Sequence, residues 1–269
     1  MDVADRVRGH YGRKDLEAVA LDALRGAGVD VETLEVGDLS GLDQLHAGGR
    51  PATEHLLDVL DLTPDSRVVD VGSGAGGPAR LAAHRHGCRV SGVDLTPELV
   101  ELARALTRRV GLDDRVTFDV GSGTDLPFPD GAFDRAMFVH VGMNVPDKAG
   151  VFAEVRRVLE PGGRFGVFEQ MRVGDAELIY PLPWADDETS SFVVPRDRYA
   201  EMLVDAGFRI DLDEDRVAAV AEVGLTPPGP GSLTPEDLIG AHFADRAGNA
   251  VASTMAGALA SIVMVATAV

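Results

Sequence analysis

Short apolar segments rich in β-branched residues alternate with amphipathic segments along the central part of the chain. The short segments have the length of strands, and the segments between them repeat apolar residues at helical spacing. The predicted strands span residues 67–71, 89–94, 115–120, 133–141 and 164–170. Strands and helices that alternate in this way form a parallel sheet covered on both faces, so the pattern predicts a doubly wound α/β fold.

The flanking segments have different patterns. Residues 1–60 show helical spacing and no strand, which predicts an N-terminal helical extension or lid before a core at 61–269. Irregular, proline-containing segments at 171–200 and 222–258 predict substrate-lid insertions, because loops at strand ends often carry specificity. The second insertion includes a helix expected to begin at Thr234. Further strands are predicted at 208–213 and from Ser261 onward.

The uncharged segment 252–269 has about the length of a membrane-spanning helix. Gly257 and Ala258 divide it, its second half is rich in valine and threonine, and no basic cluster flanks it. We therefore expect the end of a helix followed by a buried strand, and no membrane partner.

Composition excludes several classes of protein. The net charge is −19 and aromatic residues make up 5% of the chain, which argues against nucleic-acid binding. The single cysteine, Cys88, excludes an intramolecular disulfide and a thiolate metal cluster, and no metal site is expected. The polar N-terminus lacks the apolar run of a secretory signal. We expect a cytoplasmic protein; whether it is a homodimer stays open.

The most informative segment is VVDVGSGAGGPAR, residues 68–80, in which a strand leads through a glycine-rich turn into a helix. Gly72, Gly74 and Gly77 fit the G-x-G-x-x-G spacing of dinucleotide sites, so the glycines alone do not identify the ligand. Asp70 distinguishes a dinucleotide from S-adenosylmethionine, because its carboxylate would repel a pyrophosphate and attract the ammonium and sulfonium of S-adenosylmethionine. Asp94, at the end of the next strand, suits the ribose of either cofactor.

Five segments in order resemble the class I S-adenosylmethionine-dependent methyltransferases: VVDVGSGAGGPARLA, GVDLTPELVELA, LPFPDGAFDRA, HVGMNVPDK and EVRRVLEPGGRF. The likeness is nearest to small-molecule enzymes of the ubiquinone/menaquinone C-methyltransferase and sarcosine/dimethylglycine N-methyltransferase type, and spans about residues 43–208. It implies a Rossmann-like methyltransferase fold with a seven-stranded sheet whose last strand is antiparallel. It also implies that the segment 43–57 lies beside the cofactor.

The resemblance further implies which residues contact the cofactor. They are Asp70, Gly72, Gly74 and Gly76 at the methionine part, Asp94 at the ribose, Leu95 at the adenine, and His140. Where relatives usually read V-G-D-A, this chain has Val120-Gly121-Ser122-Gly123. Ser122 and Gly123 then face the adenine, with an uncharged hydroxyl in place of a carboxylate.

Methyl transfer requires a positioned nucleophile and, where the nucleophile carries a proton, a group that removes it. His140, after the fourth predicted strand, Glu169, at the end of the fifth, and His46 are the candidate catalytic residues. The alternatives are a structural histidine, a plain strand-end carboxylate and a surface histidine. The candidate substrate contacts are Met143, Asn144, Tyr180, Trp184 and Phe192. The last three rings also suit packing of the insertion onto the core.

These inferences lead to one hypothesis with two alternatives. The chain transfers a methyl group from S-adenosylmethionine to an oxygen, carbon or nitrogen atom of a small, apolar, specialised metabolite, as in natural product biosynthesis. Oxygen and carbon are favoured because candidate bases are present. One alternative is a protein of the same fold that binds S-adenosylmethionine without methylating, as a redirected catalyst such as a cyclase or as a binding protein. A remote alternative is an NAD-dependent oxidoreductase.

Overall fold

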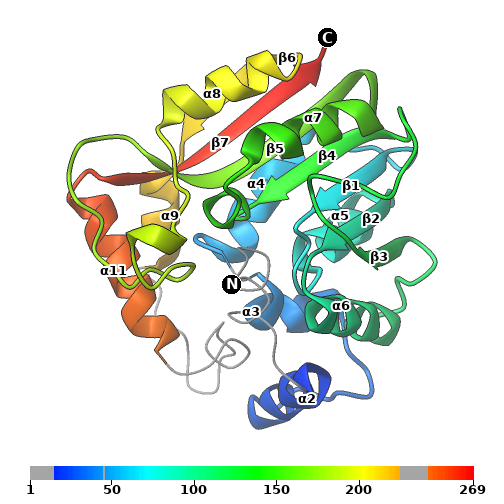
Figure 1. Cartoon of the computed structure of the whole chain (residues 1–269). Helices are drawn as coiled ribbons and strands as arrows, with labels where there is room; N and C mark the ends of the chain where they lie inside the picture. Colours follow the sequence, from blue (N-terminus) through cyan, green and yellow to red (C-terminus); the bar gives the residue numbers. More distant parts are fainter. Residues whose placement is uncertain (1–14, 45, 225–241) are drawn as a thin grey trace.

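A computed structural model of the chain describes residues 15–44, 46–224 and 242–269. Its centre is a seven-stranded sheet with the strand order β3-β2-β1-β4-β5-β7-β6 (Figure 1). The strands are β1 (Arg67–Val71), β2 (Arg89–Asp94), β3 (Val116–Val120), β4 (Phe133–Val139), β5 (Leu159–Arg172), β6 (Phe208–Asp215) and β7 (Leu259–Ala268). Strands β1 to β5 are parallel, and β7 runs antiparallel to both β5 and β6. The doubly wound sheet and its antiparallel last strand are thus confirmed.

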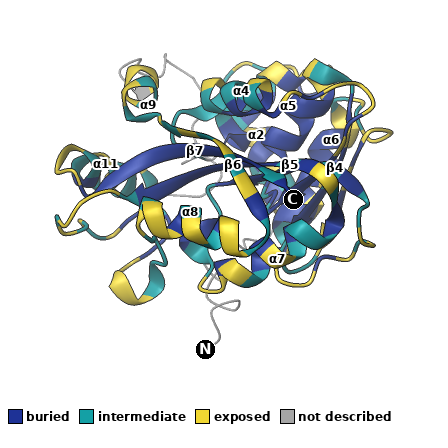
Figure 2. Cartoon of the chain, turned by 90° about the horizontal axis from the view of Figure 1, so that it is seen from above, coloured by how far each residue is buried: buried dark blue, intermediate teal, exposed yellow. Residues whose placement is uncertain are grey.

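Helices cover both faces of the sheet (Figure 2). One face carries α4 (Gly49–Leu60), α5 (Gly77–His86) and α6 (Pro97–Arg109), and the other carries α7 (Lys148–Val158) and α8 (Arg196–Asp205). Phe138, Phe152 and Phe165 form part of the buried layer between the sheet and α7, whereas Leu56 and Leu57 pack on the opposite face. Burial on both faces explains why the central strands read as nearly continuous apolar runs.

The described part of the N-terminal extension begins with α2 (Leu16–Gly26), which packs against α6 through residues such as Leu24 and Leu106. A 3-10 helix (Val36–Leu39) and the short α3 (Ser40–Asp43) then lead toward α4. The extension therefore supports the edge of the fold before its last residues reach the cavity described below.

The boundary between α7 and β5 differs from the prediction. Pro161, Gly162 and Gly163 are residues that typically end a helix, yet α7 already ends at Val158. Leu159 already pairs with Phe133 of β4, and the register shifts before Arg135 pairs with Arg164. The proline and glycines therefore form an irregularity within the first part of β5.

The segment between β5 and α8 is irregular apart from a 3-10 turn (Glu188–Ser190). Helix α9 (Val217–Gly224) follows β6, and α11 (Phe243–Met255) leads into β7. The helix expected from Thr234 lies outside the described residues. The uncharged C-terminal segment is the end of a helix followed by a buried strand, as predicted. No helix in the described ranges is long and apolar enough to cross a bilayer.

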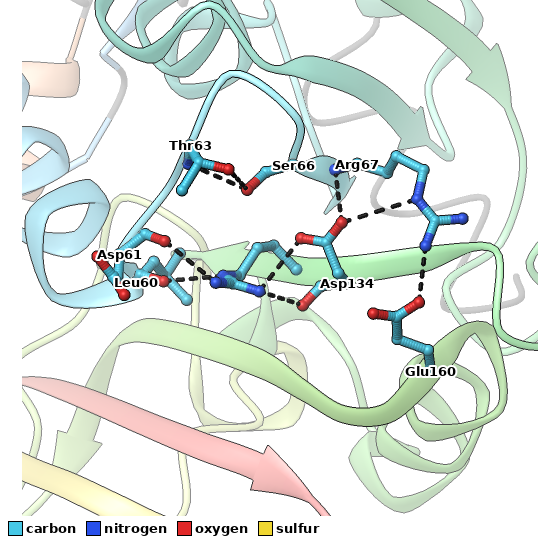
Figure 3. A network of polar contacts seen from close by, with 8 residues as sticks. Leu60, Asp61, Thr63, Ser66, Arg67, Asp134 and Glu160 are labelled. Carbon is cyan, nitrogen blue, oxygen red and sulfur yellow. Dashed lines mark hydrogen bonds and ion pairs between the residues drawn. The ribbon is translucent and has the colours of Figure 1, made fainter.

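A polar network closes the edge of the sheet at the amino ends of β1 and β4 (Figure 3). Arg135 donates to the main-chain oxygen of Leu60 at 2.9 Å and to Asp134, whose carboxylate accepts from the Arg67 main-chain N–H at 2.9 Å. Arg67 also pairs with Glu160 at 2.7 Å. These bonds fix the end of α4 to the sheet, at the edge opposite the carboxyl ends of the parallel strands.

Candidate active site

A cavity of about 390 Å³ opens at the carboxyl ends of β1, β2 and β4. Its walls come from the glycine-rich turn after β1, the end of β2, the loops after β3 and β4, and the segment before α4. The strand order reverses between β1 and β4, which is where open α/β sheets bind ligands. The volume suits a small organic molecule.

Carboxylates dominate the charge of this cavity. Among its described lining residues are four aspartates and no lysine or arginine; the aspartates are Asp43, Asp70, Asp94 and Asp147. Asp70 is 1% exposed, and its Oδ2 atom has no hydrogen-bond partner among the described residues. Burial, assisted by the charge of Asp94, raises the pKa of Asp70 to about 7. A cationic ligand would supply the counter-charge that the surroundings of this carboxylate do not.

The turn after β1 needs glycine at Gly72, where φ is +76°. A Cβ atom at this position would lie 2.4 Å from Cγ2 of Val141, so the turn and the loop after β4 touch. Gly74 donates its main-chain N–H to Oδ2 of Asp94 at 2.9 Å and thereby joins the turn to β2. Gly76 does not line the cavity, since its Cα faces Phe118 and Arg80.

Replacing Gly72 with alanine is expected to lower Tm by several degrees, because both the left-handed backbone and the contact with Val141 oppose a Cβ atom. Thermal unfolding without ligand measures this. Gly111→Ala is the matched control, with φ +66° and no atom of the described residues within 4 Å of the new Cβ. Equal losses in the two variants would show that the contact with Val141 is unimportant. Adding Val141→Ala to Gly72→Ala is expected to restore part of the loss.

The ribose and adenine candidates also line the cavity. Leu95 and Asp94 follow one another at the end of β2, and Ser122 and Gly123 lie in the loop after β3. The Ser122 hydroxyl lies 2.8 Å from Oγ1 of Thr124, which also faces the cavity. This pair of hydroxyls stands where the resemblance implies a carboxylate in relatives.

Two histidines line the cavity side by side. The rings of His46 and His140 have centroids 5.4 Å apart, and both rings contact Phe168. His46 has Nε2 at 2.9 Å from Oγ1 of Thr53 and Nδ1 at 3.1 Å from the oxygen of Ala47. Burial lowers the pKa of His46 to about 4, and burial together with His46 lowers that of His140 well below its usual value. Both imidazoles are therefore neutral at pH 7.

His140 is held in an unusual conformation. Its φ is +54°, a region that residues other than glycine rarely adopt. Its main-chain N–H donates to Phe168 at 2.8 Å, and its buried Nε2 atom has no partner among the described residues. Strain of this kind persists where the surroundings impose it, and it occurs at functional sites.

Glu169 lies behind the loop that carries His140 and does not line the cavity. Its Oε1 atom accepts the main-chain N–H groups of Val141 at 2.7 Å and Gly142 at 2.6 Å. Burial raises the pKa of Glu169 to about 7, although these hydrogen bonds and Lys148 oppose the rise. The carboxyl group thus fixes the loop, and its geometry gives it no contact with the cavity.

Only one of the five predicted substrate contacts lines the cavity. Asn144 lines the cavity, whereas Met143, Tyr180 and Trp184 belong to an apolar cluster that packs the insertion against the start of β7. The indole of Trp184 donates to Ser191 at 3.0 Å. Phe192 is joined to Met143 by a main-chain hydrogen bond of 2.9 Å and does not line the cavity either. The arrangement of Tyr180, Trp184 and Phe192 agrees with the alternative that these rings pack the insertion onto the core, where their apolar surface is buried.

Several lining residues were not among the predicted contacts, and Asp43 is one of them. Asp43 accepts a hydrogen bond from Arg80 of α5 at 2.8 Å, in an ion pair whose side chains are 2% and 0% exposed. The available signal was its position at the start of the segment that the resemblance places beside the cofactor. No group of three metal-ligating side chains occurs within the described parts of the chain.

The fold and the glycine-rich turn are similar to those of class I, S-adenosylmethionine-dependent methyltransferases. The family described as "Methyltransferase domain" matches residues 69–167.

Two curated relatives are described as methyltransferases. Methyltransferase GfsG of Streptomyces halstedii is 38% identical over 48% of this chain and 47% of its own length. A sterol 24-C-methyltransferase of Yarrowia lipolytica is 30% identical over 78% of this chain and 58% of its own. The chain spans about half the length of these relatives.

Solved structures share the fold. The [4+2]-cyclase SpnF is 25% identical with a TM-score of 0.63, covering 81% of this chain and 80% of its own. Geranyl diphosphate C-methyltransferase of Streptomyces coelicolor A3(2), solved with S-adenosyl-L-homocysteine, has a TM-score of 0.73 at 22% identity and covers 100% of this chain and 98% of its own.

Proposed function

We propose that this chain transfers the methyl group of S-adenosylmethionine to an oxygen or carbon atom of a small, apolar metabolite. The observation that carries the proposal is the buried carboxylate of Asp70, whose Oδ2 atom has no hydrogen-bond partner among the described residues, in a cavity whose described charged residues are all acidic. A sulfonium and an ammonium group match this environment, and a diphosphate does not.

The cavity residues fit the cofactor part by part. Asp70 and the glycine-rich turn would hold the methionine part, Asp94 the ribose hydroxyls, and Leu95 with Ser122 the adenine. Asp94 already accepts from the N–H groups of Gly74 and Thr96, one on each oxygen, and each oxygen retains a lone pair for a ribose hydroxyl.

The bound cofactor would supply a methyl group that its sulfonium has already activated. The chain would position the acceptor and take its proton. His140 suits the second task, because its imidazole is neutral and its Nε2 atom has no partner among the described residues. His46 is the second candidate, but its Nε2 atom already lies against Thr53.

An apolar acceptor is supported by the rest of the cavity wall. Val71, Phe138, Val141, Val145 and Val151 all line it. Sterols, named among the relatives' substrates, are acceptors of this kind. We therefore propose a specialised metabolite as the acceptor, as in natural product biosynthesis.

A second candidate function is catalysis without methyl transfer. It is favoured by the likeness to SpnF, described as a [4+2]-cyclase. Incubation with methyl-labelled cofactor and a metabolite extract separates the two. Methyl transfer predicts label in an organic product, and a cyclase predicts that the label stays on the cofactor.

We expect S-adenosylmethionine and S-adenosylhomocysteine to raise Tm by several degrees at ligand concentrations far above Kd, because they bind the folded chain. NAD is expected to leave Tm unchanged. Differential scanning fluorimetry with the three ligands checks this. A shift with NAD alone would contradict the proposed function.

A further inference from the structure

Lys148 is a buried cation outside the cavity wall. Only two of the 25 lysine and arginine residues in the chain are lysine, and Lys148 is the one that lies in the described ranges. It opens α7 and is 3% exposed. Lysine is seldom buried unless groups around it accept from its ammonium. The partners of its Nζ atom therefore indicate what this residue does.

The ammonium of Lys148 joins two segments that are far apart in the sequence. Its Nζ atom donates to the main-chain oxygen of Val145 at 2.8 Å and to that of Phe192. Val145 belongs to the loop after β4, and Phe192 to the insertion between β5 and α8. The main-chain N–H of Phe192 also donates to the oxygen of Met143 at 2.9 Å. The insertion is thus fixed to the loop by a main-chain bond and by a shared ammonium.

An ammonium suits this position better than a guanidinium. Its three N–H donors are compact and can rotate, so they reach two carbonyl oxygens on different segments, whereas a guanidinium is larger and planar. Burial lowers the pKa of Lys148 to about 8, and the negative charge of Glu169 opposes that lowering. The side chain therefore remains mostly protonated at pH 7 and keeps its three donors.

The loop that Lys148 holds forms one wall of the cavity. Val141 and Val145 line the cavity, whereas no residue of the segment 173–195 does. Glu169 fixes the start of the loop by accepting the main-chain N–H of Val141, and Lys148 fixes its far end at Val145. The insertion therefore reaches the cavity through this loop, and Lys148 provides a charged connection between the two.

We propose that Lys148 is a positioning residue for the methyl acceptor: it holds the Val145 wall of the cavity in a place set by the insertion, so the insertion influences which acceptors fit although no residue of it lines the cavity. The inference rests on the proposed function, since it takes the apolar wall as part of the acceptor site. Lys148 itself does not line the cavity and acts through Val145.

The test compares Lys148→Met with the wild-type chain. Methionine has a similar length but no donor, so the ammonium link between the loop and the insertion is lost. We expect the KM of the acceptor, identified by methyl labelling, to rise about tenfold, the effect of losing a charged hydrogen bond. The kcat and the affinity for S-adenosylhomocysteine should each change by less than about threefold, because His140, Asp70 and Asp94 keep their own contacts.

Arg156→Met is the matched control. Arg156 also lies on α7 and donates to a main-chain oxygen, that of Val269 at 2.7 Å, but it does not line the cavity. The acceptor KM of this variant should equal that of the wild type. Hydrogen exchange gives a readout that needs no acceptor, since the segment 189–195 should exchange faster in Lys148→Met than in the other two proteins.

An acceptor KM in Lys148→Met that equals the wild-type value, or unchanged exchange of the segment 189–195, would overturn the inference and leave the proposed function intact. Parallel losses of cofactor affinity, kcat and acceptor binding would also overturn it, because they would indicate a general structural defect. If the wild-type chain transferred no label to an organic product, both proposals would fail. Should Lys148→Met not fold because Glu169 loses its counter-charge, Lys148→Met/Glu169→Gln is compared with Glu169→Gln in the same assays.

Discussion

Replacing His140 with asparagine is expected to lower kcat by about 100-fold or more, since a positioned acid or base contributes roughly that factor. Asparagine tolerates the left-handed backbone of this position but offers no basic nitrogen. The substitution therefore removes the proton acceptor and spares the loop. The affinity for S-adenosylmethionine should change by less than about threefold, because Asp70 and Asp94 retain their contacts.

The measurement is the rate of S-adenosylhomocysteine formation with the acceptor identified by labelling, alongside calorimetry for the cofactor. His84→Asn is the matched control, because His84 is an exposed histidine on α5 that does not line the cavity. An unaltered rate in His140→Asn would remove His140 from the reaction and leave His46 as the candidate.

Replacing Asp70 with asparagine is expected to weaken S-adenosylmethionine binding by about 30-fold, the effect of losing one charged hydrogen bond. The wild-type affinity should also depend on pH. The pKa of Asp70 is raised to about 7, so the carboxyl group is mostly protonated at low pH and cannot attract a cation. Binding should weaken about tenfold from pH 8 to pH 6.

Calorimetry of the wild-type and Asp70→Asn proteins across this pH range separates the titration of Asp70 from that of the ligand's amine, because the amine titrates equally in both experiments. The Asp70-dependent part of the slope should be absent from Asp70→Asn. Parallel pH profiles in the two proteins would contradict the role given to this carboxylate.

The same carboxylate should reduce the stability of the ligand-free chain. A folded-state pKa above the unfolded value means that stability is full at low pH and is lost as pH rises through about 7. Asp70→Asn is therefore expected to raise Tm at pH 8 by several degrees in the absence of ligand. A gain in stability together with a loss of affinity distinguishes a binding residue from a structural one.

The sequence was sufficient for the strands because their signal is local. Alternation of β-branched runs with helices located the five parallel strands, and strand ends such as Asp70, Asp94 and His140 meet at one edge because these strands are parallel. The ends of elements were less well defined, as the early end of α7 at Val158 shows. There, pairing of Leu159 with β4 outweighed the helical pattern.

The remaining site depends on contacts that no local pattern contains. Asp43 and Arg80 are 37 residues apart, and only the path of the extension over α5 brings them together. The aromatic residues of the 171–200 insertion have no periodic pattern, so neither their packing against β7 nor their absence from the cavity wall followed from spacing. Both faces of β5 are buried around Glu169, so the sequence pattern could not show whether this carboxyl group would contact a ligand or the loop after β4.

Val141 is in contact with Gly72, follows His140 directly and donates its main-chain N–H to Glu169. Val141 therefore connects the glycine-rich turn, which would bind the methyl donor, with the loop that carries His140, which would accept the proton of the methyl acceptor. Substitutions at Val141 that aim to change the methyl acceptor would therefore disturb both cofactor binding and proton removal. Val151, which lines the cavity from α7, offers the safer starting point for enzyme engineering.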